Sequence, residues 1–325
     1  MRASAISIVY ATVRHDPGFR WFADALARQL GDGDDVEVIV VDAHHSRERT
    51  RIFRAAAAGR FPLLHVPAKP SPYQGRWRRT TRDLFAAASA RNTGIVHARG
   101  RYVVFVDDCA VPGPNWWRAV RRGAVHGEVL AGAYEKRFGM RVRDGRMVAS
   151  RRAGRSIDSR WTHGSDVGPV PIGGGGLYGS SFAAPRELLL AVNGLDEMCD
   201  AIGGEDYQLG LRLEFAGARV YYDRSMLMIE SEELGRAGPS YGRPGRTLPA
   251  AAYAERLALF GLRRRSTDGE SDAAHMVLDV VLGLRSWATH GNYYWLADLT
   301  PAALDDTARR FPHAYWFDDC PLAAL

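Results

Sequence analysis

The stretch VVFVDDCAVPGPNWW, residues 103–117, places two adjacent carboxylates at the end of an apolar strand. Residues 103–106 carry the β-branched and aromatic side chains of a buried strand, and Asp107 and Asp108 follow directly. Because neighbouring strand residues point to opposite faces, one carboxylate can reach a ribose hydroxyl while the other faces a metal ion. Aspartates that cap a turn would leave the same pattern, so the motif needs support from the rest of the chain.

Strand and helix patterns alternate around this motif. Such alternation indicates parallel strands joined by helical crossovers, and continuous apolar strands indicate a sheet covered on both faces. Ligands bind outside the carboxyl ends of strands in such sheets, where Asp42, Asp107 and Asp108 lie. The expected strands are 5–13, 36–42, 61–66 and 101–106, and the expected helices are 19–30, 46–59 and 80–98.

The second half of the chain is less regular. We expect a strand at 129–134 and further elements at 178–183, 186–192 and 205–215, separated by a basic loop at 136–160. Residues 235–246, GRAGPSYGRPGR, have the composition of a linker or mobile loop. Helical patterns follow at 248–264 and 272–287, and the tail from residue 291 adds aromatic side chains.

Composition places the chain among globular proteins. Its 325 residues are 46% hydrophobic and 25% charged, and no apolar run approaches the length of a membrane span. The N-terminal MRASAISIVYATVRH suits a first strand better than a cleaved signal, so we expect a cytoplasmic protein. Cys109, Cys199 and Cys320 are too few and too widely spaced to indicate a disulfide framework or a zinc cluster.

Arginine dominates the positive charge. The formal net charge is +6, and only Lys69 and Lys136 of the 43 basic residues are lysines. Basic residues cluster at 69–82 and 136–160, interleaved with aromatics. The clusters are compatible with solvated loops, and together they favour an anionic partner: a phosphate-bearing small molecule, nucleic acid or an acidic lipid surface. Docking of 248–264 on an anionic membrane is a competing use, against ordinary packing of that helix.

A second acidic motif is GGEDYQLGLRL, residues 203–213. Its glycines let the backbone approach a ligand, and Glu205 and Asp206 fall in the first turn of a helix. A carboxylate in that position can accept a proton from a substrate. It can also simply complement the helix dipole, and the motif alone does not separate the two roles.

The third motif is the glycine segment PIGGGGLYGSSF, residues 171–182. Four consecutive glycines before a strand form either a hinge or a place where a ligand meets the main chain. The segment is not a phosphate-binding loop of the P-loop type, because no GKS or GKT follows.

Taken in order, these motifs resemble the family 2 nucleotide-sugar glycosyltransferases. The resemblance rests on VVDAHHS at 40–46, ARNTGIVHARGRYVVFVDDCAVP at 90–112, AVNGLDE at 191–197 and GGEDYQLGLRL. It implies a GT-A (Rossmann-like) α/β fold, with a mixed, mostly parallel sheet flanked by helices and a helical C-terminal extension. It also implies a catalytic domain over 1–234, with donor binding in 1–134 and acceptor and catalytic parts in 135–234, followed by the linker and extension 235–325.

The resemblance assigns roles to particular residues. Asp206 would be the catalytic base with Glu205 beside it. Asp108 would bind a divalent cation, Mn²⁺ or Mg²⁺, on the diphosphate of a UDP- or GDP-type donor. The donor itself would be held by Asp42, Asp107, Arg91, Gly174 and Gly175.

Two positions depart from the family pattern. Cys109 stands at the usual third position of the DxD motif, and a thiol is a soft ligand poorly suited to Mg²⁺ or Mn²⁺. The family tends to place a His after the strand that follows the ED helix, where this chain reads MLMIESEEL, so Glu230 or Glu232 would serve as metal ligand. Both departures leave the metal requirement open.

The expected reaction is inverting transfer of a sugar to an acceptor hydroxyl. The acceptor is unassigned, and the arginine clusters allow nucleic acid, such as a hydroxymethylated pyrimidine in DNA. A nucleotidyltransferase or an inactive nucleotide-sugar-binding protein are the alternatives. Release of a nucleoside diphosphate rather than pyrophosphate would exclude the nucleotidyltransferase. Nucleotide affinity without turnover would indicate the inactive binding protein. A glycoside hydrolase fits less well, because its two carboxylates must flank one bond.

Overall fold

The structure is a computed structural model that describes residues 5–71, 73–78, 83–200, 203–237, 292 and 295–307. Its strands are β1 (Ile6–Thr12), β2 (Val36–Asp42), β3 (Leu63–Pro67), β4 (Tyr102–Val106), β5 (Ala110–Pro112), β6 (Val129–Arg143), β7 (Arg146–Ile157), β8 (Val170–Ile172), β9 (Ser181–Pro185) and β10 (Val220–Ser231). Its α-helices are α1 (Phe19–Ala27), α2 (Arg47–Ala57), α3 (Ala87–His97), α4 (Trp116–His126), α5 (Arg186–Ala191), α6 (Glu205–Phe215) and α7 (Glu232–Ala237).

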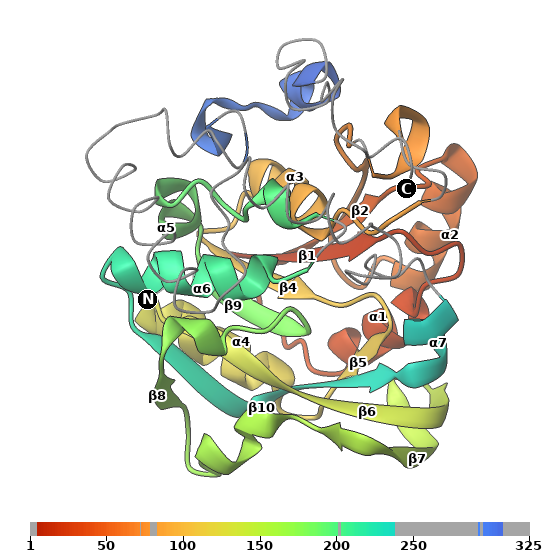
Figure 1. Cartoon of the computed structure of the whole chain (residues 1–325). Coiled ribbons are helices and arrows are strands. Elements are labelled where there is room, and N and C mark those ends of the chain that lie inside the picture. The colour runs from red at the N-terminus through yellow and green to blue at the C-terminus, as the bar shows by residue number, and fades with distance from the viewer. Residues whose placement is uncertain are drawn as a thin grey trace, which may run out of the picture.

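The strands form one sheet in the order β3-β2-β1-β4-β9-β6-β10-β5, with β7 on β6 and β8 on β10 (Figure 1). The first four strands in this order run parallel, and β9 runs antiparallel to β4 and β6. The parallel part brings the ends of β2, β1 and β4 side by side, so Asp42, Thr12 and Asp107 lie at one edge. The expected mixed, mostly parallel sheet is confirmed.

Helices cover both faces of the sheet. On one face α3, α5 and α6 contribute Ile95, Leu189 and Leu209 to a core that includes Val9, Ile39 and Phe105 of the strands. On the other face α1, α2 and α4 contribute Phe22, Phe53 and Trp116 to a core that includes Ile8, Val38 and Val104. Successive side chains along each strand point alternately into the two cores, which explains why the strand sequences are continuously apolar.

The expected basic loop at 136–160 is largely a β-hairpin instead. β6 continues to Arg143 and turns at Asp144 and Gly145, and β7 pairs back along it. Both turn residues have positive φ, 48° and 69°, as a two-residue hairpin turn of type I′ requires. The arginines masked the pattern, because apolar Met140, Val142 and Met147 alternate with them and pack against α1 and β10.

Other boundaries differ by a few residues. The helix expected from residue 80 is α3, which begins at Ala87, and the described residues 83–86 before it are not helical. The strand expected at 178–183 is β9, Ser181–Pro185. The helical stretches expected at 248–264 and 272–287 lie outside the described residues. The described residues 295–307 form short 3₁₀ turns, of which Leu296 and Leu304 reach the core beside α3. A domain boundary after residue 234 stays a prediction. No helix among the described residues is both long and apolar enough to cross a bilayer.

Glu37 links three segments at the opposite edge of the sheet. Its carboxylate accepts hydrogen bonds from the Ser7 hydroxyl and from the backbone and guanidinium of Arg99. Burial raises the pKa of Glu37, but these donors outweigh it and hold the pKa below its ordinary value. Because the folded-state pKa is the lower one, this stabilisation is complete above the unfolded pKa and is lost as the pH falls through the folded value.

We therefore expect Glu37→Gln to lower the free energy of unfolding at pH 7 by about 1–3 kcal/mol, as for hydrogen bonds to a charged group. The difference from the parent should shrink as the pH falls below about 4, because Glu37 is protonated first in the unfolded state and, at lower pH, in the folded state as well. Urea unfolding between pH 3 and 7 measures it, with the exposed Asp32→Asn as control. An effect independent of pH would show that the carboxylate charge contributes nothing.

Candidate functional site

Arg91, on α3, joins the two acidic motifs. Its side chain is buried, and Nη1 donates to Glu205 at 2.7 Å. Nη2 donates to the carboxylate of Asp107 at 3.3 Å and to the carbonyl of Gly179 at 3.1 Å. The guanidinium also lies over the ring of Phe182. The fork of Arg91 therefore fixes the end of β4, the start of α6 and the turn before β9 relative to one another.

Asp206 lies beside this network at the start of α6. Gly203 and Gly204 precede the helix with φ of 92° and 91°, a conformation that L side chains rarely adopt. The half-buried Asp206 accepts the backbone N–H of Gly179 at 2.6 Å and that of Tyr207 at 2.8 Å. A Cβ on Gly179 would stand 2.9 Å from Arg91 and 3.3 Å from Asp206, so this position admits only glycine without rearrangement.

Glu230, near the end of β10, lies close enough to Asp107 for the two carboxyl groups to interact. Its backbone pairs with Ala110 and Lys136, and the N–H of Ser231 donates to the carbonyl of Cys109. Burial and the neighbouring charge of Glu230 raise the pKa of Asp107 to about 8. Burial raises the pKa of Glu230 as well, against the ammonium of Lys136 at 3.6 Å, which lowers it. The two carboxylates thus form a pair that a cation would stabilise.

The carboxylates of Asp107 and Glu230 supply part of the donor set that a divalent cation needs. The buried Oε1 of Glu230 accepts no hydrogen bond of ordinary geometry from a described residue, although the Ser180 hydroxyl lies near the carboxylate. Two carboxylates, completed by diphosphate oxygens and water, are a usual donor set for Mg²⁺. Within the described residues no three His, Cys, Asp or Glu side chains gather into a complete protein site. Cys109 is buried, and burial raises the pKa of its thiol, so it stays protonated.

Asp108 turns to the other side of the strand end. Its carboxylate accepts the hydroxyl of Thr12 at 2.6 Å and Nε of Arg14 at 2.7 Å. Arg14 also donates to the carbonyl of Leu234 in α7. Asp108 is therefore occupied in holding the loop after β1, and its role as a metal ligand stays a prediction.

Asp42, at the end of β2, is fully buried. Arg49 donates to both of its carboxylate oxygens, and His65 and the backbone of His44 donate as well. Burial raises the pKa of Asp42, but the hydrogen bonds from His65 and Arg49 outweigh burial and hold the pKa below its ordinary value. Arg49 then reaches the carbonyls of Arg14 and His15. Direct contact of Asp42 with a nucleotide stays a prediction, and the structure shows it positioning the residues around it.

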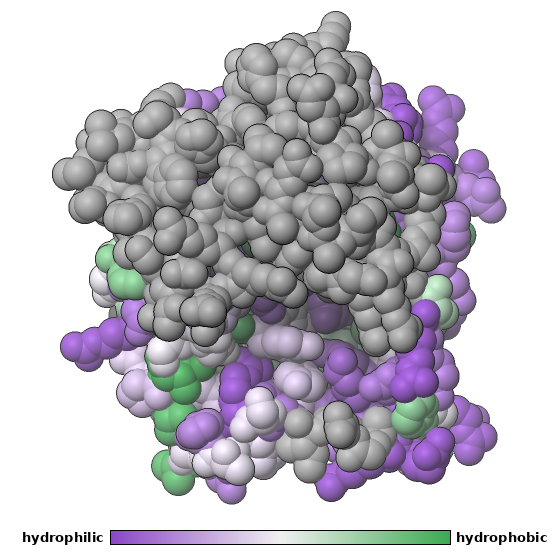
Figure 2. Space-filling view, in the orientation of Figure 1, coloured by the Kyte–Doolittle hydropathy of each residue, from purple (hydrophilic) through white to green (hydrophobic). Residues whose placement is uncertain are grey.

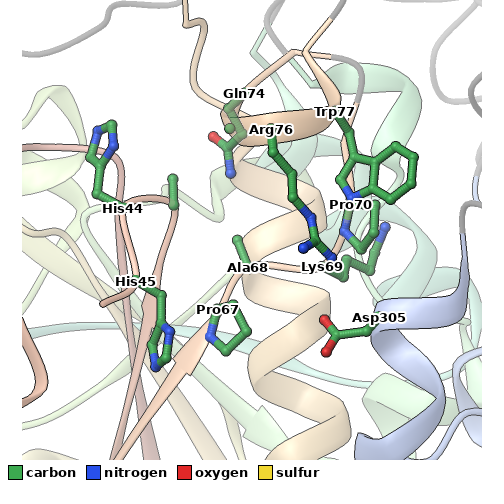
Figure 3. Close-up of a pocket in the computed structure, with 12 residues that line it drawn as sticks. His44, His45, Pro67, Ala68, Lys69, Pro70, Gln74, Arg76, Trp77 and Asp305 are labelled. Atoms are coloured by element: carbon green, nitrogen blue, oxygen red, sulfur yellow. The ribbon is translucent and has the colours of Figure 1, made fainter. Parts of the chain in front are cut away.

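A pocket of about 470 Å³ opens next to Asp42, at the ends of β2 and β3 (Figure 3). His44 and His45 line one side, and Asp305 reaches in from the C-terminal segment on the opposite side. Gln74, Arg76 and Trp77 come from the loop after β3, with the guanidinium of Arg76 over the Trp77 ring. The pocket offers flat groups and hydrogen-bond donors and acceptors, which is the lining that a nucleobase needs.

The glycine segment packs against α6. A Cβ on Gly174 would come within 2.2 Å of the Gly210 carbonyl, and one on Gly175 within 2.7 Å of the Tyr207 ring. Close packing of segment and helix therefore explains these glycines, and a donor-binding role for Gly174 and Gly175 stays a prediction. The residue of this segment that lies at the carboxylates is Gly179.

The structure thus brings together Arg91, Glu205, Asp206, Asp107 and Glu230. It places Asp42 and Asp108 behind them as supports of the loop after β1. Sequence reasoning missed Gly179 and the pocket residues, including His44 and His45. A signal existed for His44 and His45, because they directly follow a strand that ends in a carboxylate. The loop at 74–77 had only its composition as a signal.

Comparisons with known proteins agree with this architecture. The model of the family described as Glycosyl transferase family 2 matches residues 20–177. These residues form a glycosyltransferase family 2 domain, and the resemblance seen in the motifs is confirmed. No match is found among curated proteins.

Solved structures show the GT-A fold. The chain is similar to GalNAc-T7, crystallised with UDP, GalNAc and Mn²⁺, with a TM-score of 0.55 and 12% identity over 90% of this chain. It spans 59% of the GalNAc-T7 chain. Mannosyltransferase PcManGT from Pyrobaculum calidifontis, in complex with GDP-Man and Mn²⁺, is similar at a TM-score of 0.48 and 18% identity, covering 99% of this chain and 86% of that one. TarS 1–349 from S. aureus gives 0.49 and 13%, covering 94% and 91%.

The close approach at Gly179 generates a test. We expect Gly179→Ala to destabilise the fold by about 1–3 kcal/mol, because the added methyl displaces Arg91 or Asp206 in a packed site. Gly168→Ala is the matched control, since a Cβ there meets nothing within 4 Å and its φ is not positive. Urea unfolding of both variants measures the difference. Equal stability of the two would contradict the tight geometry described above.

Proposed function

We propose that this protein is an inverting glycosyltransferase that moves a sugar from a nucleoside diphosphate donor, of UDP or GDP type, to an acceptor hydroxyl. The observation that carries the proposal is the position of Asp206. It lies at the start of α6, held by the Gly179 N–H, beside the Arg91 network that contains Asp107. A single positioned base is what inverting transfer requires, because the leaving diphosphate needs charge neutralisation rather than a proton.

In the proposed step the acceptor oxygen attacks the anomeric carbon of the donor sugar. The bond from that carbon to the diphosphate oxygen breaks, and the bonding electrons leave with the nucleoside diphosphate. Asp206 takes the proton of the acceptor hydroxyl. Its two hydrogen bonds to backbone N–H groups orient the carboxylate and leave lone pairs for this proton.

The donor is proposed to lie across the edge of the sheet. β2 and β4 flank β1, so their ends are about 10 Å apart at the usual strand spacing. A nucleobase in the pocket beside His44 and His45 would then place its diphosphate toward Asp107. UDP and Mn²⁺ in the GalNAc-T7 structure, which shares the fold, support a donor of this class.

For the divalent cation we propose Asp107 and Glu230 as the protein ligands. The cation would neutralise charge on the leaving diphosphate. Asp108 keeps Arg14 and the loop after β1 in place, which reverses the roles that the motif alone suggests for the two aspartates. Glu230 stands where the family tends to have a His, and it adds a hard oxygen ligand at that place.

For the acceptor, the sequence raised a hydroxymethylated pyrimidine in DNA. The exposed arginines of the β6–β7 hairpin support a polyanionic acceptor beside the site.

The test of the base is Asp206→Asn. A thermal-shift panel of UDP- and GDP-sugars, with and without Mn²⁺, first identifies the donor. We then expect the variant to lose about 10²- to 10⁴-fold in nucleoside diphosphate release, without a comparable loss of donor affinity. Asp32→Asn, at an exposed carboxylate, should keep the parental rate. Parental turnover by Asp206→Asn would refute the assignment.

Cation binding tests the reversed roles of the aspartates. With UDP present, Asp107→Asn and Glu230→Gln should each weaken Mn²⁺ binding by at least about tenfold, the loss typical even of outer-shell changes. Asp108→Asn should lower thermal stability through Arg14 and change Mn²⁺ affinity much less. Electron paramagnetic resonance of free Mn²⁺ reports the affinity independently of activity. A larger affinity loss in Asp108→Asn than in the other two would restore the motif-based assignment.

A further inference from the structure

Residues 135–152, which we call the basic hairpin, carry an excess of positive charge. Seven of their side chains are basic, and two, Glu135 and Asp144, are acidic. Arg137 and Arg152 both ion-pair with Glu135. Arg141, Arg143 and Arg146 are exposed and form no ion pair in the described part of the chain. In Figure 2, hydrophilic atoms predominate at the lower right edge, where Figure 1 places the ends of β6 and β7.

Packing does not explain these arginines. The inner face of the basic hairpin is apolar, with Met140 buried against Ala25 and Ile229. At the turn, Gly145 fits directly against the backbone of α1 at Asp24 and Ala25. The basic hairpin is therefore anchored to the domain through its inner face, and its exposed arginines lie on the outer face.

The strand register places like charges opposite one another. Arg143 pairs with Arg146, and Arg137 pairs with Arg152, across β6 and β7. Like charges directly opposite in an antiparallel pair are destabilising. Glu135 ion-pairs with both members of the Arg137–Arg152 pair, whereas within the described residues no ion pair compensates Arg143 and Arg146. Such an arrangement favours an anionic partner that supplies the missing charge.

The basic hairpin begins beside Glu230, the proposed metal ligand. Lys136 pairs in the sheet with Glu230 and its ammonium lies 3.6 Å from that carboxylate. From there β6 leads outward to Arg143. The acids that face the hairpin from α7 are already engaged, since Glu233 accepts the N–H of Gly139 and the hydroxyl of Ser231. A chain bound along the arginines would therefore end at the site.

An aromatic pair stands at the base of the basic hairpin. The rings of Tyr134 and Tyr178 stack with centroids 4.6 Å apart, and the guanidinium of Arg160 lies 5.6 Å from the centroid of the Tyr178 ring. Tyr178 is 37% exposed and directly precedes Gly179, whose N–H holds Asp206. A nucleobase that contacts the exposed part of Tyr178 would thus lie next to Asp206, the proposed catalytic base.

We propose that the basic hairpin and Tyr178 bind a nucleic acid strand that carries the acceptor hydroxyl, an inference that rests on the proposed function. Arginine forks match phosphate oxygens, and aromatic side chains provide stacking surfaces for bases. The combination of a basic track with an aromatic platform is the usual construction of single-strand binding surfaces. An acidic polysaccharide would use the same arginines, and competition with heparin distinguishes it from a nucleic acid.

The experiment measures binding of a fluorescein-labelled single-stranded DNA 20-mer by anisotropy across a salt series. In Arg141→Gln/Arg143→Gln/Arg146→Gln we expect affinity to fall tenfold or more, and the salt slope of log K to decrease by about 2, from three lost phosphate contacts. The matched control Arg47→Gln/Arg51→Gln/Arg54→Gln removes the same charge from exposed positions of α2 and should retain most of the affinity. Tyr178→Leu should weaken binding, and Tyr178→Phe should retain it.

Three results would overturn the inference. The first is that the parent protein does not bind the 20-mer. The second is that the hairpin and α2 variants lose affinity equally, which would show attraction by net charge alone. The third is that heparin competes with, and binds more tightly than, both single- and double-stranded DNA, which would assign the surface to an acidic polysaccharide.

Donor turnover separates this inference from the proposed function. Nucleoside diphosphate release with water as acceptor should be unchanged in the hairpin variant, because its arginines contact neither donor nor base. If nucleoside diphosphate release depends on Asp206 but DNA affinity is the same in the hairpin variant and the parent, the transferase proposal is supported and the proposed acceptor class is wrong. If DNA binding depends on the hairpin but no donor is turned over, the surface stands and the transferase proposal fails.

Discussion

The buried guanidinium of Arg91 carries the positive charge that holds the acidic motifs of this protein together. Without it, Glu205 would be a buried carboxylate without its closest counter-charge, 2.7 Å away, and Asp107 would face Glu230 with less compensation. The same fork takes the carbonyl of Gly179, whose N–H orients Asp206. One side chain on α3 therefore sets the distances among three segments that are far apart in the chain.

Two further arginine–aspartate pairs form a second layer. Arg49, on α2, pairs with Asp42 at the end of β2 and donates to the Arg14 carbonyl in the loop after β1. Arg14, in that loop, pairs with Asp108 after the end of β4. The strand-end aspartates thus act on a ligand through the loop and pocket that they shape. This arrangement gathers the carboxyl groups of Asp107, Glu230 and Asp206 inside the site and places positive charge at the rim, on Lys136 and the basic hairpin. The separation suits a site that binds a cation and a diphosphate inside and a polyanion outside.

The motifs identified most of the acidic site residues but not their partners. Asp107 and Asp108 are neighbours in sequence with opposite surroundings, and the strand alternation that separates them was readable from the start. Which of the two faces Glu230 depends on β10 arriving beside β5, a contact between residues more than a hundred positions apart. The hairpin at 136–160 was missed although Asp144 and Gly145 are a strong turn signal, because its arginines obscured the alternation of Met140 and Val142.

By itself, the sequence determined the order of strands and helices in the first half, the covered parallel sheet and the edge at which ligands bind. Those follow from local periodicity and from the geometry of parallel crossovers. Only the tertiary structure decided that Arg91 bridges Glu205 and Asp107, that Asp42 is enclosed by Arg49 and His65, and that the four-glycine segment packs on α6. Hydrogen bonds and close contacts of this kind depend on side-chain positions in three dimensions, and no spacing along the chain encodes them.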